Sequence, residues 1–323
     1  MFIEALKAFF FGIVEGITEW LPISSTGHMM LFNQFVELDV SETFYATFLV
    51  VIQLGAIMAV IVLYFDKLNP FSRKKSPAQK RNTWGIWAKV VVGSIPPAIV
   101  GFLLDDWLEE KVMNNPDVAY IVVSVALIVY GVIFIVLERR NKQLIADAQR
   151  LQGRHMRNVD SLSGQEAASA ASTALADTPL DASSIIAKVN TFEELSYGRA
   201  FLIGIFESLA VIPGTSRSGS TIIGSMLLGT SRTVATEFAF FLAIPIMFGW
   251  SLIKFIKHGF GYTGTEWMIL VIGIVTAFVV SIFSIKFLIG YVKKNDFTAF
   301  GIYRIILAVF VLAYFGSKAL GVW

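Results

Sequence analysis

Two glutamates inside an apolar stretch are the first residues that could do chemistry. Glu15 and Glu19 are separated by four positions, so on a helix they share one face and lie about 6 Å apart along the axis. Ionisable side chains are costly in lipid and normally face a polar interior where they function. Two carboxylates this close cannot both stay ionised without a compensating cation, so the pair predicts an arginine or a metal ion beside it.

Hydroxyl groups gather at two interruptions of the apolar sequence, one after Pro22 and one after Pro213. Each interruption runs directly into an apolar segment, as helix N-caps do. The free N–H groups and the positive dipole end of a helix bind anions, and Arg217 can fork two oxygens. Two such helix ends that meet within the membrane predict a phosphate or diphosphate site. Besides Arg217, the expected substrate-binding residues are Ser24, Thr26, Gln53, Gly214, Ser216, Ser218 and Thr221.

The nucleophile of such a site stays open at this level. His28 follows Ser25 by three residues, which is close enough on one helical turn for a contact between imidazole and hydroxyl. Ser25 with His28 as its base, His28 itself, or a water activated by His28 would each serve. Gln53 lies in the middle of an apolar window, where it either binds a ligand or caps a neighbouring helix.

The elements that must position these residues belong to a membrane protein. Of 323 residues, 55% are hydrophobic and 15% are charged, whereas a soluble domain carries roughly 25% charged residues. The formal charge of +2 is too balanced for a nucleic-acid binder, so no nucleic-acid partner is expected. The absence of cysteine excludes disulfides, a thiolate nucleophile and a Cys-ligated metal.

Six windows have the apolar composition of spanning helices, which need about 20 residues. Two more apolar windows, 5–35 and 199–229, are interrupted by Pro and Gly and are better explained as re-entrant pairs of half-helices. The predicted fold is therefore an all-α polytopic membrane protein. The six expected spans are 44–65, 84–104, 118–138, 233–256, 266–290 and 297–320.

A mixed-charge stretch at 139–198 separates two similar halves, 1–138 and 199–323. The stretch holds too little apolar surface to order itself, which predicts a flexible or part-helical linker. A Gly-Ile-x-Glu tetrapeptide followed by a Pro-containing break occurs in each half, beginning at Gly12 and at Gly204. Interrupted apolar segments at corresponding positions indicate a midplane site between repeats. With three spans and one re-entrant pair in each half, the chain is expected to form an inverted repeat.

The charges of two loops predict the orientation. Loop 66–83 carries six basic residues and one acidic residue, whereas loop 105–117 carries five acidic residues and one basic residue. By the positive-inside rule the first loop and the linker are cytoplasmic and the second loop is outside. The first re-entrant pair then enters from outside and the second from inside. Lys254 and Lys257, on the predicted outer side, count against this orientation.

Two long motifs carry a family resemblance. The first is Glu15-x-x-x-Glu19 running into Pro22-x-Ser24-Ser25-Thr26-Gly27-His28, and the second is Pro213-Gly214-Thr215-Ser216-Arg217-Ser218-Gly219-Ser220-Thr221. Together they closely resemble the bacterial undecaprenyl-diphosphate phosphatase family, also called the bacitracin-resistance proteins. The resemblance spans the chain except for about 139–190, which looks like an insertion.

The resemblance implies that the protein removes one phosphate from undecaprenyl diphosphate at the outer face of the bacterial cytoplasmic (inner) membrane, and so recycles the lipid carrier of peptidoglycan synthesis. It also implies a divalent cation, Mg²⁺ or Ca²⁺, and bacitracin resistance through competition for the lipid. Carried over residue by residue, the catalytic candidates are Ser25, His28, Glu19 and Arg217, and the metal ligands are Glu15 and Glu19.

Other classes of protein stay open. Inverted repeats with broken helices are typical of secondary transporters, and a lipid flippase would share them. A non-catalytic scaffold would leave the buried charges unexplained. The sequence is silent on oligomeric state, and a homodimer is one option.

Overall fold

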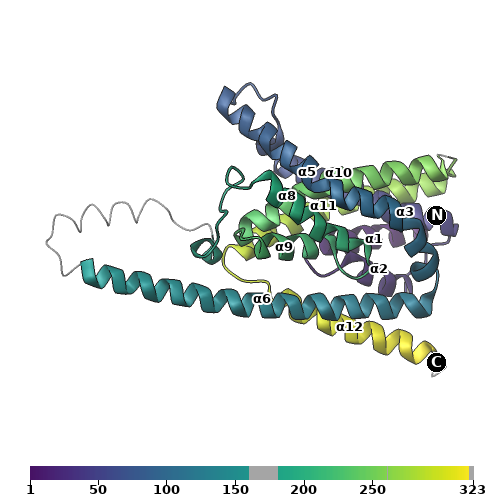
Figure 1. Cartoon of the computed structure of the whole chain (residues 1–323). Coiled ribbons are helices and arrows are strands. Elements are labelled where there is room, and N and C mark those ends of the chain that lie inside the picture. Colours follow the sequence, from purple (N-terminus) through teal and green to yellow (C-terminus); the bar gives the residue numbers. More distant parts are fainter. Residues whose placement is uncertain (160–180, 260, 320–323) are drawn as a thin grey trace.

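The computed structural model describes residues 1–159, 181–259 and 261–319 (Figure 1). Its α-helices are α1 (Phe2–Thr18), α2 (Ser25–Asn33), α3 (Glu42–Leu63), α4 (Phe65–Leu68), α5 (Pro77–Leu108), α6 (Pro116–Val159), α8 (Tyr197–Ser208), α9 (Arg217–Leu227), α10 (Arg232–His258), α11 (Gly264–Val292) and α12 (Thr298–Ala319). Short turns of other helix types are η1 (Glu109–Met113), η2 (Ala182–Ile185) and η3 (Leu209–Val211). No strand occurs in these described ranges, so the predicted all-α class is confirmed.

Six helices of the described chain are long and apolar enough to cross a membrane, and each coincides with one predicted window. They are α3, α5 extended by η1, α6, α10, α11 and α12. Helix α5 begins ahead of the apolar window 84–104, because Ser76 and Gln79 form a capping box and Pro77 occupies the first turn. The multi-pass architecture is therefore as predicted. The polar first turns of α5 lie outside the apolar window, so hydropathy alone does not locate the start of this helix.

The two interrupted windows each form two helices joined by a break, α1 and α2 across residues 19–24 and α8 and α9 across residues 209–216. Each second helix begins after a serine in the left-handed region, Ser24 with φ 74° and Ser216 with φ 72°. These are the non-glycine residues with positive φ in the described chain. The hydroxyl of Ser24 accepts from the backbone N–H of Gly27, and that of Ser216 accepts from Gly219. The two breaks therefore share an unusual local geometry.

Each first half-helix packs closely against a spanning helix of the other half, α1 on α11 and α8 on α5. A Cβ at Gly12 would lie 2.8 Å from the carbonyl oxygen of Gly273, and one at Gly204 would lie 1.9 Å from that of Gly93. Both positions therefore require glycine for the backbones to approach. The halves make corresponding contacts, while the inverted repeat itself stays a prediction.

The predicted linker contains helix and buried side chains in the parts of it that the structure describes. Helix α6 continues to Val159, and Figure 1 shows it projecting beyond the bundle. In the described range that begins at residue 181, Val189, Phe192 and Leu195 are buried against the helical core. Lys89 donates a hydrogen bond to the carbonyl of Phe192 at 2.6 Å. Within the predicted linker 139–198, α6 therefore covers residues 139–159, residues 181–196 include side chains packed on the core, and residues 160–180 lie outside the described ranges.

A buried ion pair anchors this returning segment. Arg232 donates to both carboxylate oxygens of Glu138, at 2.9 and 2.5 Å. Beside it, the backbone N–H of Arg232 donates to Ser183, and Asp181 accepts from the backbone and the hydroxyl of Thr233. These bonds join α6, η2 and α10, which the sequence separates widely.

The two lysines that count against the predicted orientation are both paired with acid groups. Lys254 lies 2.8 Å from a carboxylate oxygen of Glu109, and Lys257 lies 2.7 Å from one of Asp106. Both partners belong to the acidic loop 105–117, so the lysines lie at the same end of the bundle as that loop. They still count as basic residues at the predicted outer end, because acidic residues contribute little to the positive-inside rule.

Candidate active site

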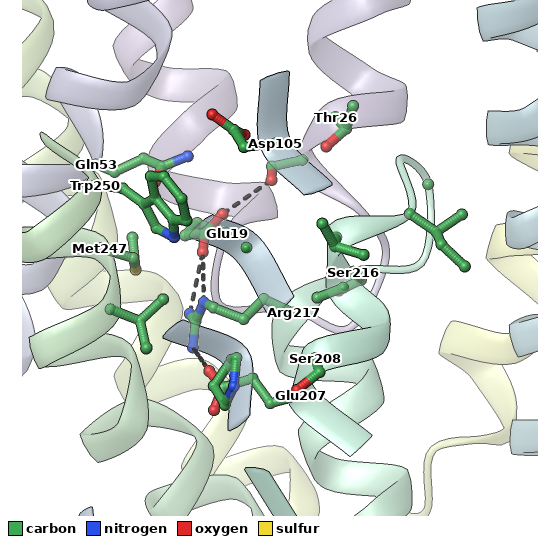
Figure 2. Close-up of a pocket in the computed structure, with 18 residues that line it drawn as sticks. Glu19, Thr26, Gln53, Asp105, Glu207, Ser208, Ser216, Arg217, Met247 and Trp250 are labelled. Atoms are coloured by element: carbon green, nitrogen blue, oxygen red, sulfur yellow. Dashed lines mark hydrogen bonds and ion pairs between the residues drawn. The ribbon is translucent and has the colours of Figure 1, made fainter. Parts of the chain in front are cut away.

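A pocket of about 240 Å³ lies where the two breaks meet α3, α5 and α10 (Figure 2). Its polar lining is Glu19, Ser25, Thr26, Gln53, Asp105, Glu207, Ser208, Ser216 and Arg217. Its apolar wall includes Pro97, Val211, Ile212, Ile246, Met247 and Trp250. The pocket thus combines ionic groups from both breaks with a surface suited to hydrocarbon.

Glu19 occupies the centre of the polar cluster. Its Oε2 accepts a hydrogen bond from the hydroxyl of Ser25 at 2.9 Å. Its Oε1 accepts from Nη2 and Nε of Arg217, at 3.0 and 3.3 Å. The first residues of α2 and α9 are therefore both bonded to the residue that follows α1, which brings the two helix N-termini together.

Arg217 lies between two carboxylates (Figure 2). Besides its bonds to Glu19, its Nη1 lies 3.8 Å from Oε1 of Glu207 and donates to the carbonyl of Ala239 at 3.0 Å. The guanidinium also faces the ring of Trp20, 5.7 Å from the ring centroid. The cation that the Glu15–Glu19 pair predicts is present as an arginine.

The N-cap serines and their neighbours are partly used by the fold. Ser24 is fully buried, and Ser218 donates to the backbone carbonyl of Glu19 at 3.1 Å. Thr221 donates to the carbonyl of Arg217 at 2.8 Å. These predicted substrate-binding residues lie outside the pocket lining, whereas Thr26, Gln53, Gly214 and Ser216 line it as expected.

His28 does not contact Ser25 as the helical spacing suggests. Its Nδ1 lies 2.7 Å from the carbonyl oxygen of Ser24, and its Nε2 lies 2.7 Å from the hydroxyl of Tyr303. The ring is also stacked on that of Tyr303. Because the carbonyl can only accept, Nδ1 carries the proton and Nε2 accepts from the phenol. The expected contact is therefore corrected: the partner of the Ser25 hydroxyl is Glu19.

Glu15 and Glu19, the expected metal ligands, differ in the hydrogen bonds that their carboxylates accept. Both oxygens of Glu19 accept hydrogen bonds, whereas Oε1 of Glu15 is buried without a hydrogen-bond partner. Within the described ranges no group of three or more His, Cys, Asp or Glu residues is arranged to hold a metal ion. This donor set does not cage a metal, but it fits Mg²⁺ that takes most of its ligands from water and substrate phosphate.

Three charged residues near the site were not among the predicted site residues. Glu207 and Asp105 line the pocket. Arg304 is fully buried and donates to backbone carbonyls of both breaks, so Arg217 is not the only fixed cation there. Each of the three lies in an apolar stretch or at its edge, and an ionisable residue in such a place is a site candidate by default.

The fold and pocket define a class: a multi-pass helical membrane protein with a buried site of carboxylate, hydroxyl and guanidinium groups at two facing helix N-termini. The chain belongs to the family described as "Bacitracin resistance protein BacA", which matches residues 8–310. This membership agrees with the resemblance carried by the two motifs.

Curated relatives match nearly the whole chain. The protein named undecaprenyl-diphosphatase from Acetivibrio thermocellus is 48% identical over 313 residues, covering 97% of this chain and 98% of the relative. Undecaprenyl-diphosphatase 1 from Clostridioides difficile is 48% identical, with 97% of each protein covered. The undecaprenyl-diphosphatase of Enterococcus faecalis is 45% identical, covering 97% of this chain and 98% of the relative.

Proposed function

We propose that this protein hydrolyses undecaprenyl diphosphate to undecaprenyl phosphate and inorganic phosphate, which returns the lipid carrier to peptidoglycan synthesis. The observation that carries the proposal is the hydrogen-bonded cluster of Ser25, Glu19 and Arg217 at two helix N-termini. A serine beside a carboxylate and a guanidinium is an arrangement for phosphoryl transfer, in which positioning and charge neutralisation dominate. The names of the relatives support the same substrate.

The reaction proceeds in two displacements. The Ser25 oxygen attacks the terminal phosphorus as its proton passes to Glu19, and the bond from that phosphorus to the bridging oxygen breaks. The bridging oxygen leaves with the bonding electrons as part of undecaprenyl phosphate. Water then attacks the phosphorus of the phosphoserine, and the bond from that phosphorus to the Ser25 oxygen breaks. Glu19 returns the proton that it took up to the serine oxygen, which restores the hydroxyl, and the phosphate departs with both protons of the water. Arg217 keeps two N–H groups outside its bonds to Glu19 and Ala239, one on Nη2 and one on Nη1, which also lies 3.8 Å from Glu207. These two groups would donate to the phosphate oxygens of the substrate.

A divalent cation, Mg²⁺ or Ca²⁺, belongs to this proposal. Glu15, with its unpaired oxygen, and Glu19 are the protein groups that would hold it. When bound, the cation would neutralise part of the diphosphate charge. The serine, carboxylate and arginine perform the proton transfer and the orientation without it.

The site faces the extracytoplasmic side of the bacterial cytoplasmic membrane in this proposal. Asp105 lies in the last turn of α5, within the acidic stretch 105–117, and also lines the pocket. The pocket therefore opens toward the acidic end of the bundle, which the positive-inside rule places outside.

Single cysteines test this orientation, because the chain has none of its own. Asn114→Cys at the acidic end and Lys74→Cys in the basic loop are both exposed positions. A membrane-impermeant maleimide applied to intact cells should label the first and spare the second. Labelling of Lys74→Cys alone would put the site on the cytoplasmic face.

The proposal also includes two partners, bacitracin and a second copy of the chain. Bacitracin would compete for the lipid diphosphate. Raised expression of the wild-type protein should therefore increase the bacitracin concentration needed to stop growth, and raised expression of the Ser25→Ala variant should leave it unchanged.

A homodimer is also part of the proposal, and light scattering of the purified protein tests it directly. A mass of one chain in detergent would remove it.

Phosphate release by the purified protein tests the proposed activity. In detergent, with a long-chain prenyl diphosphate as substrate, the wild-type protein should release phosphate and the Ser25→Ala variant should not. A transporter or flippase needs two compartments and would release none. No phosphate release above the Ser25→Ala control would overturn the proposed function.

A further inference from the structure

Helix α12 reaches both breaks through two consecutive residues, although neither belongs to the motifs. Arg304 is fully buried, and its Nη1 donates to the carbonyl of Pro22 at 3.2 Å. Its Nη2 donates to the carbonyls of Gly214 and Thr215, both at 2.8 Å. Its neighbour Tyr303 bonds His28, whose other nitrogen bonds the carbonyl of Ser24. One turn of α12 therefore contacts both breaks.

The acceptors of Arg304 flank the two residues with unusual backbone. Pro22 lies two positions before Ser24, and Gly214 and Thr215 directly precede Ser216. Both serines have φ near +70°, at 74° and 72°, and non-glycine residues keep such conformations only when the surroundings enforce them. A guanidinium with three backbone acceptors on two segments provides that enforcement, because it fixes both breaks to one rigid group.

Arg304 differs from the buried arginines Arg217 and Arg232, because no carboxylate of the described chain is paired with it. Arg232 is paired with Glu138 and Arg217 with Glu19. In the described chain no carboxylate lies within ion-pair distance of Arg304, which faces carbonyl oxygens and the ring of Tyr130, 5.5 Å from its centroid. A desolvated cation without a counter-ion is costly. Its location behind two helix N-termini adds positive potential where a diphosphate would bind.

We infer that Arg304 is a positioning residue for the phosphatase reaction: it holds the strained serines of both breaks in register, so that Ser25 and the N-terminus of α9 face one phosphate. It does not line the pocket and acts through the backbone of the breaks. The inference rests on the proposed function, since it assigns a role within that reaction.

Steady-state kinetics of Arg304→Gln and Arg304→Lys, per mole of folded protein, test this role. Folded protein is measured by fluorescence-detected size exclusion, and phosphate release from a long-chain prenyl diphosphate gives kcat and KM. We expect Arg304→Gln to lower kcat by more than tenfold per folded molecule. Arg304→Lys, which keeps the charge but not the fork, should recover part of the loss.

Val311→Ala is the matched control, because Val311 is equally buried on the same helix and bears no polar group. It should lower the thermal unfolding temperature but leave kcat per folded molecule within twofold. If Arg304→Gln behaves in the same way, with only stability reduced, the inference is wrong and Arg304 is structural. Should Arg304→Gln not fold, Arg304→Lys decides by the same criterion: wild-type kcat overturns the inference, and a kcat lowered more than threefold supports it. Phosphate release by the wild-type protein, run in parallel, separates this outcome from a failure of the proposed function itself.

Discussion

The hydroxyl of Ser25 donates to Oε2 of Glu19 at 2.9 Å, while the other oxygen of that carboxylate accepts from Arg217. The arginine thus fixes the carboxylate orientation, and the free lone pairs of the serine oxygen point away from its proton acceptor. In the proposed reaction these three residues are the nucleophile, its base and the group that orients the base, and their hydrogen bonds join them into one connected unit. Such units respond to mutation as a whole, which shapes the predictions that follow.

Ser25→Ala and Glu19→Gln should each lower kcat by about 10²-fold or more, because each removes proton transfer from the attacking oxygen. The double variant should be no worse than the poorer single variant. Steady-state phosphate release measures all three. Additive losses would mean that the two residues act separately. Acid-quenched reactions with a ³²P-labelled terminal phosphate should also leave label on Ser25, and its absence would favour direct attack by water.

Arg217→Ala should lower kcat/KM by far more than tenfold, because it removes the guanidinium that is paired with the buried carboxylates Glu19 and Glu207 and that would neutralise the substrate phosphate. Arg217→Lys should recover little, since an ammonium cannot fork two oxygens. A loss of less than about tenfold in the alanine variant, roughly 1.4 kcal/mol, would show that Arg217 is not the phosphate clamp.

His28→Asn should retain more activity than His28→Ala. The asparagine amide can replace Nδ1 as the donor to the Ser24 carbonyl, whereas alanine leaves that carbonyl without its partner. If His28 instead accepted the Ser25 proton, both variants would be equally inactive, because asparagine is not a base. Initial rates at saturating substrate distinguish the two outcomes.

Glu15→Gln and Glu19→Gln should each raise the Mg²⁺ or Ca²⁺ concentration needed for half-maximal activity. The double change should be less than additive if one cation contacts both carboxylates. Titration of the metal-stripped protein with each cation measures this. Unaltered metal dependence in both single variants would remove the metal role and leave Glu19 as the base alone.

Gly204→Ala should destabilise the fold by about 1–3 kcal/mol, because the added methyl would meet the Gly93 carbonyl at the contact of α8 with α5. Gly198→Ala, on the same helix, has open space around the added methyl and should cost nothing. Thermal unfolding in detergent compares the two. Equal unfolding temperatures would contradict the close packing of α8 on α5.

Sequence by itself determined the six spans, the two broken windows and the gathering of Glu19, Ser25 and Arg217 around the two breaks. These features depend on local composition, because hydropathy sets which helices cross lipid and serine caps mark where a helix restarts. The sequence also required a cation beside Glu19, since unpaired charges are costly in lipid. It could not choose between a metal and an arginine.

Only the tertiary structure decided which groups meet. Helical spacing paired Ser25 with His28, yet the Ser25 hydroxyl bonds Glu19 at the end of α1 and the His28 ring bonds Tyr303 of α12. Arg217 reaches Glu19 across 198 positions, and contacts of such separation depend on how whole helices dock. In the sequence Arg304 is one charged residue in an apolar span, and only the packing of α12 against both breaks shows which carbonyls it bonds. Hydrogen-bond partners are selected by backbone direction over a few ångströms, and neither spacing nor hydropathy encodes that direction.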